Sequence, residues 1–224
     1  MQQLNTIYTL LLNKFGAQGW WPVAGKYAEA FKHRKKTEEE KFEIAVGAIL
    51  TQSTNWKNVE KALDSLKNSN ALNAKAIQKM PLRRLASVIR SSGYHTQKAK
   101  KLKALVDYRG EITREGLLSV WGIGPETADS ILLYAYDLPY FVADAYTKRI
   151  FSRYGFVDKD AGYGEVQRVF HNFYNNYFNR KDKEKVKAYN EYHALIVELG
   201  KNYCKKKPLC SRCPINNGCK KLGV

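Results

Sequence analysis

The chain of 224 residues carries 38 Lys and Arg against 21 Asp and Glu, which gives a formal net charge of +17. An excess of this size points to a polyanionic partner, and the 15 Tyr and 4 Trp residues offer flat surfaces that stack on bases. No apolar run approaches the roughly 18 residues of a membrane span, and the N-terminal segment lacks the features of a secretory signal. We therefore expect no membrane association and an intracellular, cytoplasmic location, with one domain or two small lobes.

The helical period dominates the chain. Apolar residues return every three to four positions along much of its length, whereas no segment alternates as a strand does. The sequence therefore predicts an all-α fold. The predicted helices cover residues 4–12, 37–50, 59–66, 82–89, 98–108, 125–135, 142–154, 166–174 and 186–203.

A capping box marks the start of the second of these helices. The hydroxyl of Thr37 can accept from the backbone N–H of Glu40, and the Glu40 carboxylate can accept from the backbone N–H of Thr37. The basic run from His33 to Lys36, just before this box, is interpreted as a solvated approach to the helix.

Two glycines, Gly122 and Gly124, indicate a tight turn ahead of a helix, and Asp144 follows twenty residues later. Either glycine can adopt a positive φ and allows another backbone to approach closely. Pro125 suits the first helical position, because its missing N–H would have no intrahelical partner there. The free N–H groups and positive dipole end at such a helix start suit a phosphate. An ordinary interhelical turn is the alternative interpretation.

All four cysteines lie within 16 residues, with five, two and five residues between them. In a reducing compartment such clustering favours a metal over disulfides. Structural zinc sites usually place two close pairs on either side of a longer loop, whereas a compact run can wrap an iron–sulfur cubane. An iron–sulfur cluster is the preferred interpretation, and zinc is the alternative. The ligands would be Cys204, Cys210, Cys213 and Cys219.

Several of these motifs together resemble one known family. The hairpin at 118–132 and the following segment 138–150, which carries Asp144, are similar to the helix-hairpin-helix DNA glycosylases of the endonuclease III superfamily. Residues 47–54 resemble the family's early helix and its glutamine-bearing loop, and residues 92–100 resemble a later loop. The resemblance runs nearly end to end.

The resemblance implies a two-lobed helix-hairpin-helix fold. A six-helix lobe would cover residues 31–138, and residues 1–30 with 139–224 would form a second lobe that holds the cysteines. Asp144 would lie at the mouth of the cleft between the lobes. The family's C-terminal cysteines carry a [4Fe–4S] cluster, although the first gap is usually six residues and here is five.

The resemblance also assigns roles to single residues. Asp144 aligns with the family's catalytic Asp. Gln52 matches a position from which the family inserts a side chain into the gap left by the flipped base, and capping the nearby helix end is the alternative role. The expected partner is double-stranded DNA with damaged bases, bound by a monomer. The expected DNA contacts are Gln52, Gly122, Ile123, Gly124, Thr127 and Lys148.

The chemistry of such a site follows from the bond that breaks. Cleavage of an N-glycosidic bond builds positive charge on the sugar, and a carboxylate at Asp144 would stabilise that charge more than it stabilises the ground state. The same carboxylate can orient or deprotonate a water. The base must first be flipped out of the stack, at a cost of a few kcal/mol.

Strand cleavage is not expected. Family members that also cut the strand use a Lys on the hairpin helix as an amine nucleophile, and Glu126 takes that position here. A Glu cannot form a Schiff base, and Lys148 lies too far along the next helix to replace it. We therefore expect a monofunctional glycosylase. Glu126 is either a helix N-terminal residue favoured by the dipole or a residue near the lesion.

The choice of substrate depends on finer features. Residues 20–22, 48–52, Trp56 and the hairpin 121–126 are most similar to the bacterial 3-methyladenine glycosylase branch, which often lacks the cysteine run. A methylated purine of this kind is cationic and leaves readily, and an aromatic face holds a cation by about 0.5–2 kcal/mol. Trp21 and Trp56 are the candidates for a sandwich around the base, with Trp20 as a substitute. A role of these rings in the core is the alternative.

Two other functions stay open. The first is a glycosylase for deaminated, oxidised or mismatched bases. A panel of lesion duplexes would distinguish it from a glycosylase for alkylated purines. A module that binds damaged DNA without chemistry would show salt-sensitive binding and no turnover. An adenine-mismatch glycosylase would carry a Glu at the position of Gly47, and a thymine or uracil mismatch relative typically has a Tyr at the position of Glu126.

Overall fold

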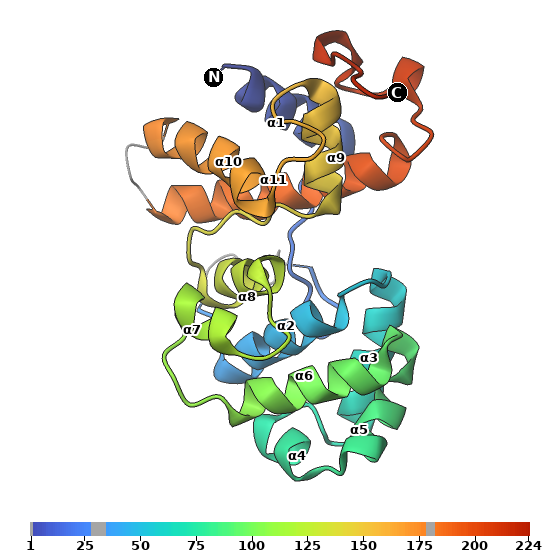
Figure 1. The fold of residues 1–224 in the computed structure, drawn as a ribbon, viewed down its shortest axis with the longest axis vertical. Helices are drawn as coiled ribbons and strands as arrows, with labels where there is room; N and C mark the ends of the chain where they lie inside the picture. Colours follow the sequence, from blue (N-terminus) through green and yellow to red (C-terminus); the bar gives the residue numbers. More distant parts are fainter. Residues whose placement is uncertain (1, 28–34, 178–181) are drawn as a thin grey trace. The chain divides into compact units, whose positions relative to one another are not determined.

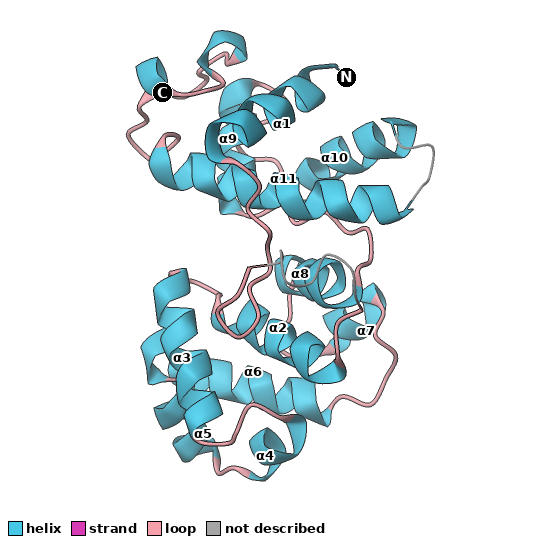
Figure 2. Cartoon of the chain, turned by 180° about the vertical axis from the view of Figure 1, so that it is seen from behind, coloured by secondary structure: helices cyan, strands magenta, loops and turns pink. Residues whose placement is uncertain are grey.

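The computed structural model describes residues 2–27, 35–177 and 182–224. Over these residues the chain is helical, with an isolated β-bridge between Val23 and Lys26 and no strand (Figures 1 and 2). The prediction of an all-α fold is confirmed. None of the helices in the described ranges is long and apolar enough to cross a lipid bilayer. His33 and Arg34, from the basic run ahead of the capped helix, lie outside the described residues.

The chain divides into two compact units. Unit 1 consists of Met1–Trp20 and Asp137–Val224, and unit 2 consists of Trp21–Tyr136. The expected boundary between residues 30 and 31 falls outside the described residues, and the division in the sequence comes earlier, between Trp20 and Trp21. The adjacent tryptophans Trp20 and Trp21 therefore belong to different units.

Unit 2 contains seven of the described helices and one short 3₁₀ turn, η2 (Arg90–Ser92). The helices are α2 (Glu38–Leu50), α3 (Trp56–Asn68), α4 (Ala74–Lys79), α5 (Leu82–Val88), α6 (His95–Asp107), α7 (Arg114–Ser119) and α8 (Pro125–Tyr136). The short helices α4 and α7 are missing from the sequence prediction, because six residues are too few to display a helical period.

Helix α2 forms the centre of unit 2. Its residues Glu43–Leu50 are all buried, and it packs against α3, α6 and α8. The predicted capping box is present: Thr37 Oγ1 accepts from Glu40 N at 3.3 Å, and Glu40 Oε2 accepts from Thr37 N at 2.8 Å. The start of the buried helix is thus fixed by its own sequence.

Unit 1 combines the first helix of the chain with the last three long ones. These are α1 (Gln2–Phe15), α9 (Ala145–Tyr154), α10 (Tyr163–Tyr177) and α11 (Asp182–Asn202), followed by the 3₁₀ turns η3 (Cys210–Arg212) and η4 (Asn216–Gly218). Helix α11 packs against α1 and α9, and α10 packs against α9. Figure 1 shows α11 in orange with α1, in blue, beside it.

Aromatic rings fill the core of unit 1. Phe141 stacks on Phe170 with 3.6 Å between the ring centroids. Tyr192 on α11 is fully buried, and its hydroxyl donates to the carbonyl oxygen of Leu4 at 2.9 Å. This bond joins α11 to α1 across 188 positions of sequence, and it shows how the N-terminal helix becomes part of a unit made mainly of C-terminal residues.

Candidate active site

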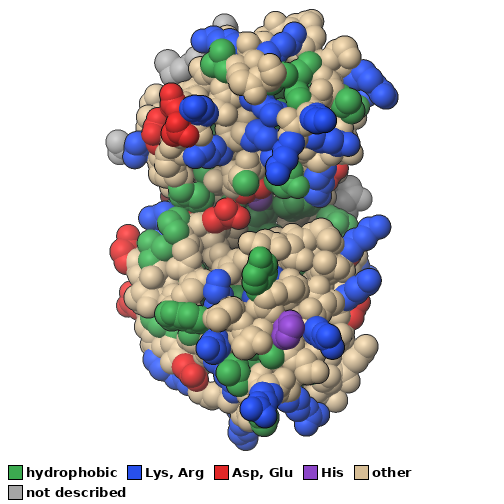
Figure 3. Space-filling view, turned by 45° about the vertical axis from the view of Figure 1, so that its right-hand side comes forward, with side chains coloured by type: hydrophobic (Ala, Val, Ile, Leu, Met, Phe, Trp, Pro, Cys, Tyr) green, Lys and Arg blue, Asp and Glu red, His purple; other side chains and the backbone are tan. Residues whose placement is uncertain are grey.

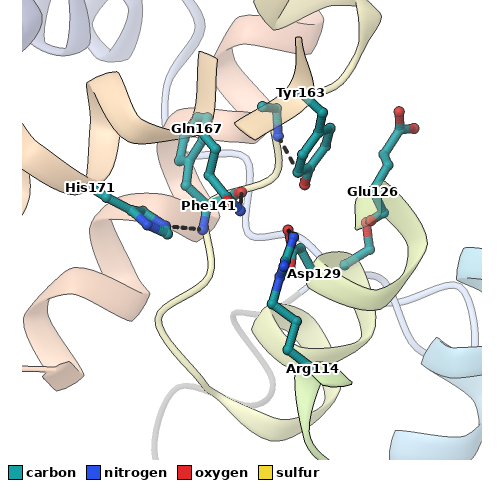
Figure 4. A network of polar contacts seen from close by, with 9 residues as sticks. Arg114, Glu126, Asp129, Phe141, Tyr163, Gln167 and His171 are labelled. Carbon is teal, nitrogen blue, oxygen red and sulfur yellow. Dashed lines mark hydrogen bonds and ion pairs between the residues drawn. The ribbon is translucent and has the colours of Figure 1, made fainter. Parts of the chain in front are cut away.

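The segment that leads into Asp144 is held by helix α10. Phe141 N donates to His171 Nε2 at 3.1 Å, and Gln167 Nε2 donates to Phe141 O at 2.8 Å. Two residues later, Ala143 N donates to the hydroxyl of Tyr163 at 3.5 Å. Figure 4 shows His171, Gln167 and Tyr163 directed at this stretch of backbone. The position of the residue that follows is therefore set by side chains from one helix face.

Asp144 is the N-cap of helix α9. The predicted helix over 142–154 begins only at Ala145, because Asp144 is extended (φ −70°, ψ 179°) and its side chain closes the first turn. Its Oδ1 accepts from Thr147 N at 2.8 Å and from Thr147 Oγ1, also at 2.8 Å. One oxygen of the carboxylate is therefore used by the helix, and Thr147 makes no bond to the other, Oδ2.

A histidine from helix α11 lies beside the second oxygen. His193 Nε2 is 3.6 Å from Asp144 Oδ2, and both side chains are largely buried, with 6% and 13% of their surface exposed. Burial alone would raise the pKa of Asp144. The nearby His193 imidazole, with the two bonds from Thr147, outweighs burial and leaves the pKa of Asp144 below its ordinary value. The carboxyl is thus held in its ionised form.

Trp20 lies against the same histidine. The two rings meet edge to face at 5.6 Å between centroids. The loop that carries Trp20 is fixed to α11 by Glu191, whose two carboxylate oxygens accept from Gln18 N at 2.6 Å and from Gly19 N at 3.3 Å. Lys201 Nζ stands over the Trp20 ring, 5.6 Å from its centroid. Unit 1 therefore gathers Trp20, His193 and Asp144 from three separate parts of the chain.

The glycine turn of unit 2 begins helix α8. Gly122 has φ +84°, and a Cβ built there would lie 2.5 Å from Lys101 Cγ, so this position requires glycine. A Cβ on Gly124 would meet no atom within 4 Å, and this glycine lies open at the surface. The side chain of Ile123, between the two, is buried, so any DNA contact there comes from its backbone. Pro125 is the first residue of α8, as expected.

Gln52 binds the hairpin. Its Nε2 donates to Thr127 Oγ1 at 2.9 Å and to Gly122 O at 3.3 Å, and its Oε1 accepts from Lys101 Nζ at 2.5 Å. The C-cap of α2 is Thr51, and the Gln52 side chain bonds to the hairpin and to α6 instead of capping α2. Thr127 is buried and used in this internal bond.

A buried ion pair fixes α7 to α8 at the same hairpin. Arg114 Nε lies 2.7 Å from Asp129 Oδ1, and the Asp129 side chain has no exposed surface (Figure 4). Glu126 is exposed in the first turn of α8, which suits a carboxylate near a helix N-terminus. Trp121, directly before Gly122, is 56% exposed and is a hairpin residue for which the sequence assigned no separate role.

The tryptophans of unit 2 do not form the expected sandwich. Trp21 and Trp56 contact each other with 5.2 Å between centroids and an angle of 89° between the rings, and Trp21 also packs on Tyr134 at 5.1 Å. A planar base can be held only between roughly parallel faces that are further apart. Trp21 is 7% exposed, and its ring lies 3.3 Å from the position of a Cβ on Gly47. The expected sandwich is therefore wrong for this pair: Trp21 is buried in the core, and the partly exposed Trp56 meets its ring edge to face.

The four cysteines line one pocket in unit 1. Cys204, Cys210, Cys213 and Cys219 share it with apolar and basic side chains that include Ile150, Ile215 and Arg153. Mutual charge contributes to raising the pKa of Cys213 and Cys219, after the larger effect of burial, so the sulfurs are near one another. Yet no three His, Cys, Asp or Glu side chains of the described residues converge tightly enough to hold a single metal ion.

Four cysteines that line one pocket could hold a polynuclear cluster. A tetrahedral zinc needs all four sulfurs at about 2.3 Å from one point, whereas a cubane takes one thiolate on each of four separate irons. Arg153 NH1 lies 3.4 Å from Cys204 Sγ and would donate to that sulfur, which suits an anionic cluster. The donor set and its surroundings thus fit a [4Fe–4S] group.

The structure distributes the predicted site residues between the units. Unit 1 contains Asp144, Trp20, the half-buried Lys148 and the cysteines, and unit 2 contains the hairpin residues with Gln52, Trp21 and Trp56. Two residues at Asp144 escaped the sequence prediction. Thr147 follows the cap by three positions, a spacing that could have revealed it, whereas nothing in the sequence around His193 points to Asp144.

Known proteins match this chain along most of its length. Residues 46–176 match the family described as HhH-GPD superfamily base excision DNA repair protein. The protein named "Putative DNA repair glycosylase MJ1434" from Methanocaldococcus jannaschii is 39% identical over 234 aligned residues, which cover 97% of this chain and 96% of that protein.

Two solved structures superimpose on most of this chain. The H. pylori 3-methyladenine DNA glycosylase (MagIII) bound to 1,N6-ethenoadenine superimposes with a TM-score of 0.71 at 30% identity, covering 89% of this chain and 96% of that one. A trapped endonuclease III–DNA covalent intermediate superimposes with a TM-score of 0.77 at 20% identity, covering 98% and 95%, and shares the fold.

This chain belongs to the HhH-GPD superfamily of base excision DNA repair proteins. It is accordingly a DNA glycosylase, an enzyme of base excision repair whose partner is DNA.

Proposed function

We propose that the protein is a monofunctional glycosylase that flips alkylated purines of the 3-methyladenine type out of double-stranded DNA and removes them by hydrolysis. The observation that carries the proposal is the buried, oriented carboxylate of Asp144. Thr147 holds one oxygen at 2.8 Å, and the other faces His193. A fixed anion of this kind stabilises an oxocarbenium-like sugar without reorganising during the reaction.

The absence of strand cleavage follows from the hairpin helix. The position that carries a nucleophilic Lys in bifunctional relatives is Glu126, which is exposed in the first turn of α8. A carboxylate there cannot form the Schiff base that precedes β-elimination. Lys148 lies four residues after Asp144 on α9, half-buried, and we assign it to DNA binding.

The choice of alkylated purines is supported by chemistry and by similarity. A 3- or 7-methylated purine already carries positive charge, so hydrolysis needs an anion for the sugar more than an acid for the base. Trp20, next to His193, offers an aromatic ring close to the catalytic residue, and we assign the base contact to it in place of the Trp21–Trp56 pair. The 30% identity to a 3-methyladenine glycosylase structure supports the same class.

The hairpin supplies the DNA-binding element of the proposal. Gly124 is open at the N-terminal end of α8, where backbone N–H groups and the helix dipole favour a phosphate. The net charge of +17 and the Lys and Arg side chains that lie over much of the face in Figure 3 suit a polyanion. We propose that Gln52 enters the gap left by the flipped base by exchanging its bonds to Gly122 and Thr127 for DNA.

We assign the four cysteines to a [4Fe–4S] cluster, which would hold the C-terminal segment to α9. When bound, such a cluster supplies an iron bond to each thiolate and contributes to folding. Arg153 on α9 donates to Lys205 O at 2.6 Å and to Lys206 O at 3.1 Å, and Arg149 Nε donates to Cys204 O at 2.8 Å. These bonds place the cluster segment against the helix that Asp144 caps.

The test is single-turnover base release from methylated duplex DNA. Each sample is divided, and strand breaks are measured in one half directly and in the other half after heat and alkali. We expect release of free 3-methyladenine, with nicks only after alkali. Asp144→Asn should abolish release while binding to DNA persists, because the charge is lost and the backbone contacts are not. An Asp144→Asn variant with full activity would show that another group is catalytic.

Other results would assign the protein to a different substrate class. Release of uracil, hypoxanthine or an oxidised base, without release of methylated purines, would support the alternative glycosylase function. Salt-sensitive binding with no release from any of these duplexes would leave a module that binds damaged DNA without chemistry.

A further inference from the structure

His193 is a buried imidazole directed at the carboxylate on which the proposed function depends. Its Nε2 lies 3.6 Å from Asp144 Oδ2, on the side of the carboxylate that Thr147 leaves open. Only 6% of the His193 side chain is exposed. A buried polar ring costs free energy unless it interacts with a polar partner, and Asp144 Oδ2 is the carboxylate oxygen that lies beside this ring.

The orientation of the imidazole is fixed by rings from two other parts of unit 1. Trp20 meets it edge to face at 5.6 Å, and Phe141 does so at 6.4 Å. Glu191, two residues before His193 on α11, holds the loop of Trp20 through Gln18 and Gly19. The imidazole therefore keeps its Nε2 toward Asp144 without relying on the substrate.

We infer that His193 is a positioning residue for the glycosylase reaction, which fixes Oδ2 of Asp144 toward the sugar and keeps the carboxyl ionised inside a buried site. The inference rests on the proposed role of Asp144. Oδ1 is already bound by Thr147, so His193 acts on the one oxygen that can stabilise developing positive charge on the sugar.

Among the groups that surround Asp144, His193 has the largest lowering effect on the pKa of the carboxyl. On α9, Thr147 donates two uncharged bonds to Asp144. From α10, Tyr163 reaches the backbone of Ala143. On α11, Lys201 lies over the Trp20 ring. Burial raises the pKa of Asp144, and the neighbouring His193 imidazole lowers it more than the bonds of Thr147 do. Loss of the imidazole leaves burial opposed only by Thr147, so the pKa of Asp144 should rise.

Two variants separate the ring from its polar atom. His193→Phe keeps an aromatic ring between Trp20 and Phe141 but has no donor, and His193→Gln restores a donor without the ring. His95→Gln is the control, because it removes an imidazole at the start of α6 in unit 2, and none of the described contacts of Asp144 comes from α6. Thermal unfolding checks that each variant is folded.

The first readout needs no substrate. The carboxyl carbon of Asp144 is followed by NMR in ¹³C-Asp-labelled protein and assigned by its loss in Asp144→Asn. We expect a titration below the ordinary Asp value in the wild type, a clear upward shift in His193→Phe, partial recovery in His193→Gln and no shift in His95→Gln. A wild-type titration above the ordinary value, or a His193→Phe titration equal to the wild type, would overturn the inference.

The second readout is single-turnover base release from methylated duplex DNA between about pH 4 and pH 8. His193→Phe should lower the rate by about tenfold to a hundredfold and move its acidic limb to higher pH, with little change in DNA binding. Inactive Asp144→Asn beside a fully active His193→Phe would contradict this inference alone. Fully active Asp144→Asn would instead contradict the proposed function, whatever the NMR titration shows.

Discussion

Gly122→Ala tests the turn that presents the hairpin. Gly122 has φ +84°, where an L-residue costs about 1–2 kcal/mol. The added Cβ would also lie 2.5 Å from Lys101 Cγ and 2.8 Å from Lys101 Cε, so the lysine chain must move away from Gln52, to which its amine is bonded. Crowding of this kind costs about 1–3 kcal/mol. Together the two effects should lower the free energy of unfolding by about 2–5 kcal/mol.

The matched control is Gly124→Ala. This glycine does not have a positive φ, and its added Cβ would meet no atom within 4 Å, so stability should stay within about 1 kcal/mol of the wild type. Its Cβ would instead stand where the proposed phosphate approaches. We expect the midpoint temperature of thermal unfolding to fall by about 4–20 °C for Gly122→Ala and to stay nearly unchanged for Gly124→Ala. The affinity for DNA should fall for both variants. Equal unfolding temperatures for the two variants would refute the reasoning.

Three further predictions concern other parts of the chain. Lys98→Met should destabilise unit 2, because the buried amine donates to Leu50 O at 2.8 Å and to Ser92 O at 2.5 Å. Burial, with a smaller effect of Lys101, lowers the pKa of Lys98 in the folded protein to about 8. Above that pH the Lys98 amine is deprotonated in the folded protein but still protonated in the unfolded chain. The free energy of unfolding of the wild type should therefore increase relative to that of Lys98→Met as the pH rises from 8 towards the ordinary lysine pKa. Urea unfolding of both proteins at several pH values measures this difference, and a difference that does not change with pH would contradict the prediction. Aerobically purified protein should be yellow-brown with about four irons per chain, and metal analysis that finds one zinc would remove the cluster assignment. Glu126→Lys should allow borohydride to trap a covalent DNA adduct, and failure to trap one from folded protein would leave Glu126 as a helix N-terminal residue.

The helical fold could be predicted because its signals are local. Thr37 and Glu40 form the capping box that their spacing indicates, and Pro125 opens α8. Six-residue helices such as α4 and α7 carry too few turns for a period to appear. The start of α9 was placed three residues early for a related reason: apolar residues continue through Val142 and Ala143, and only the side-chain bond from Asp144 marks the helix start.

The candidate site was harder to predict, because its parts are distant in sequence. The motif indicated Asp144, but Trp20 and His193 lie 124 and 49 positions away from it and reach it through the packing of α1 and α11. The Trp21–Trp56 sandwich failed because a sequence gives the presence of two rings and not the angle between them, which is 89°. Gln52 was expected either to cap a helix or to enter DNA, and the observed bonds to Gly122 and Thr127 depend on a hairpin seventy positions away.

Asp144 has two roles that a single substitution can separate. As N-cap of α9 it contributes about 1 kcal/mol to stability, and in the reaction that we propose its negative charge acts on the sugar. Asn is as good an N-cap as Asp, because its carbonyl oxygen can accept from Thr147 N, so Asp144→Asn removes the charge and keeps the helix start. Ala would remove both and release the turn that the bonds from α10 hold in place. A loss of activity in Asp144→Asn with an unchanged unfolding temperature therefore reports on the charge alone, which is the quantity that the glycosylase chemistry requires.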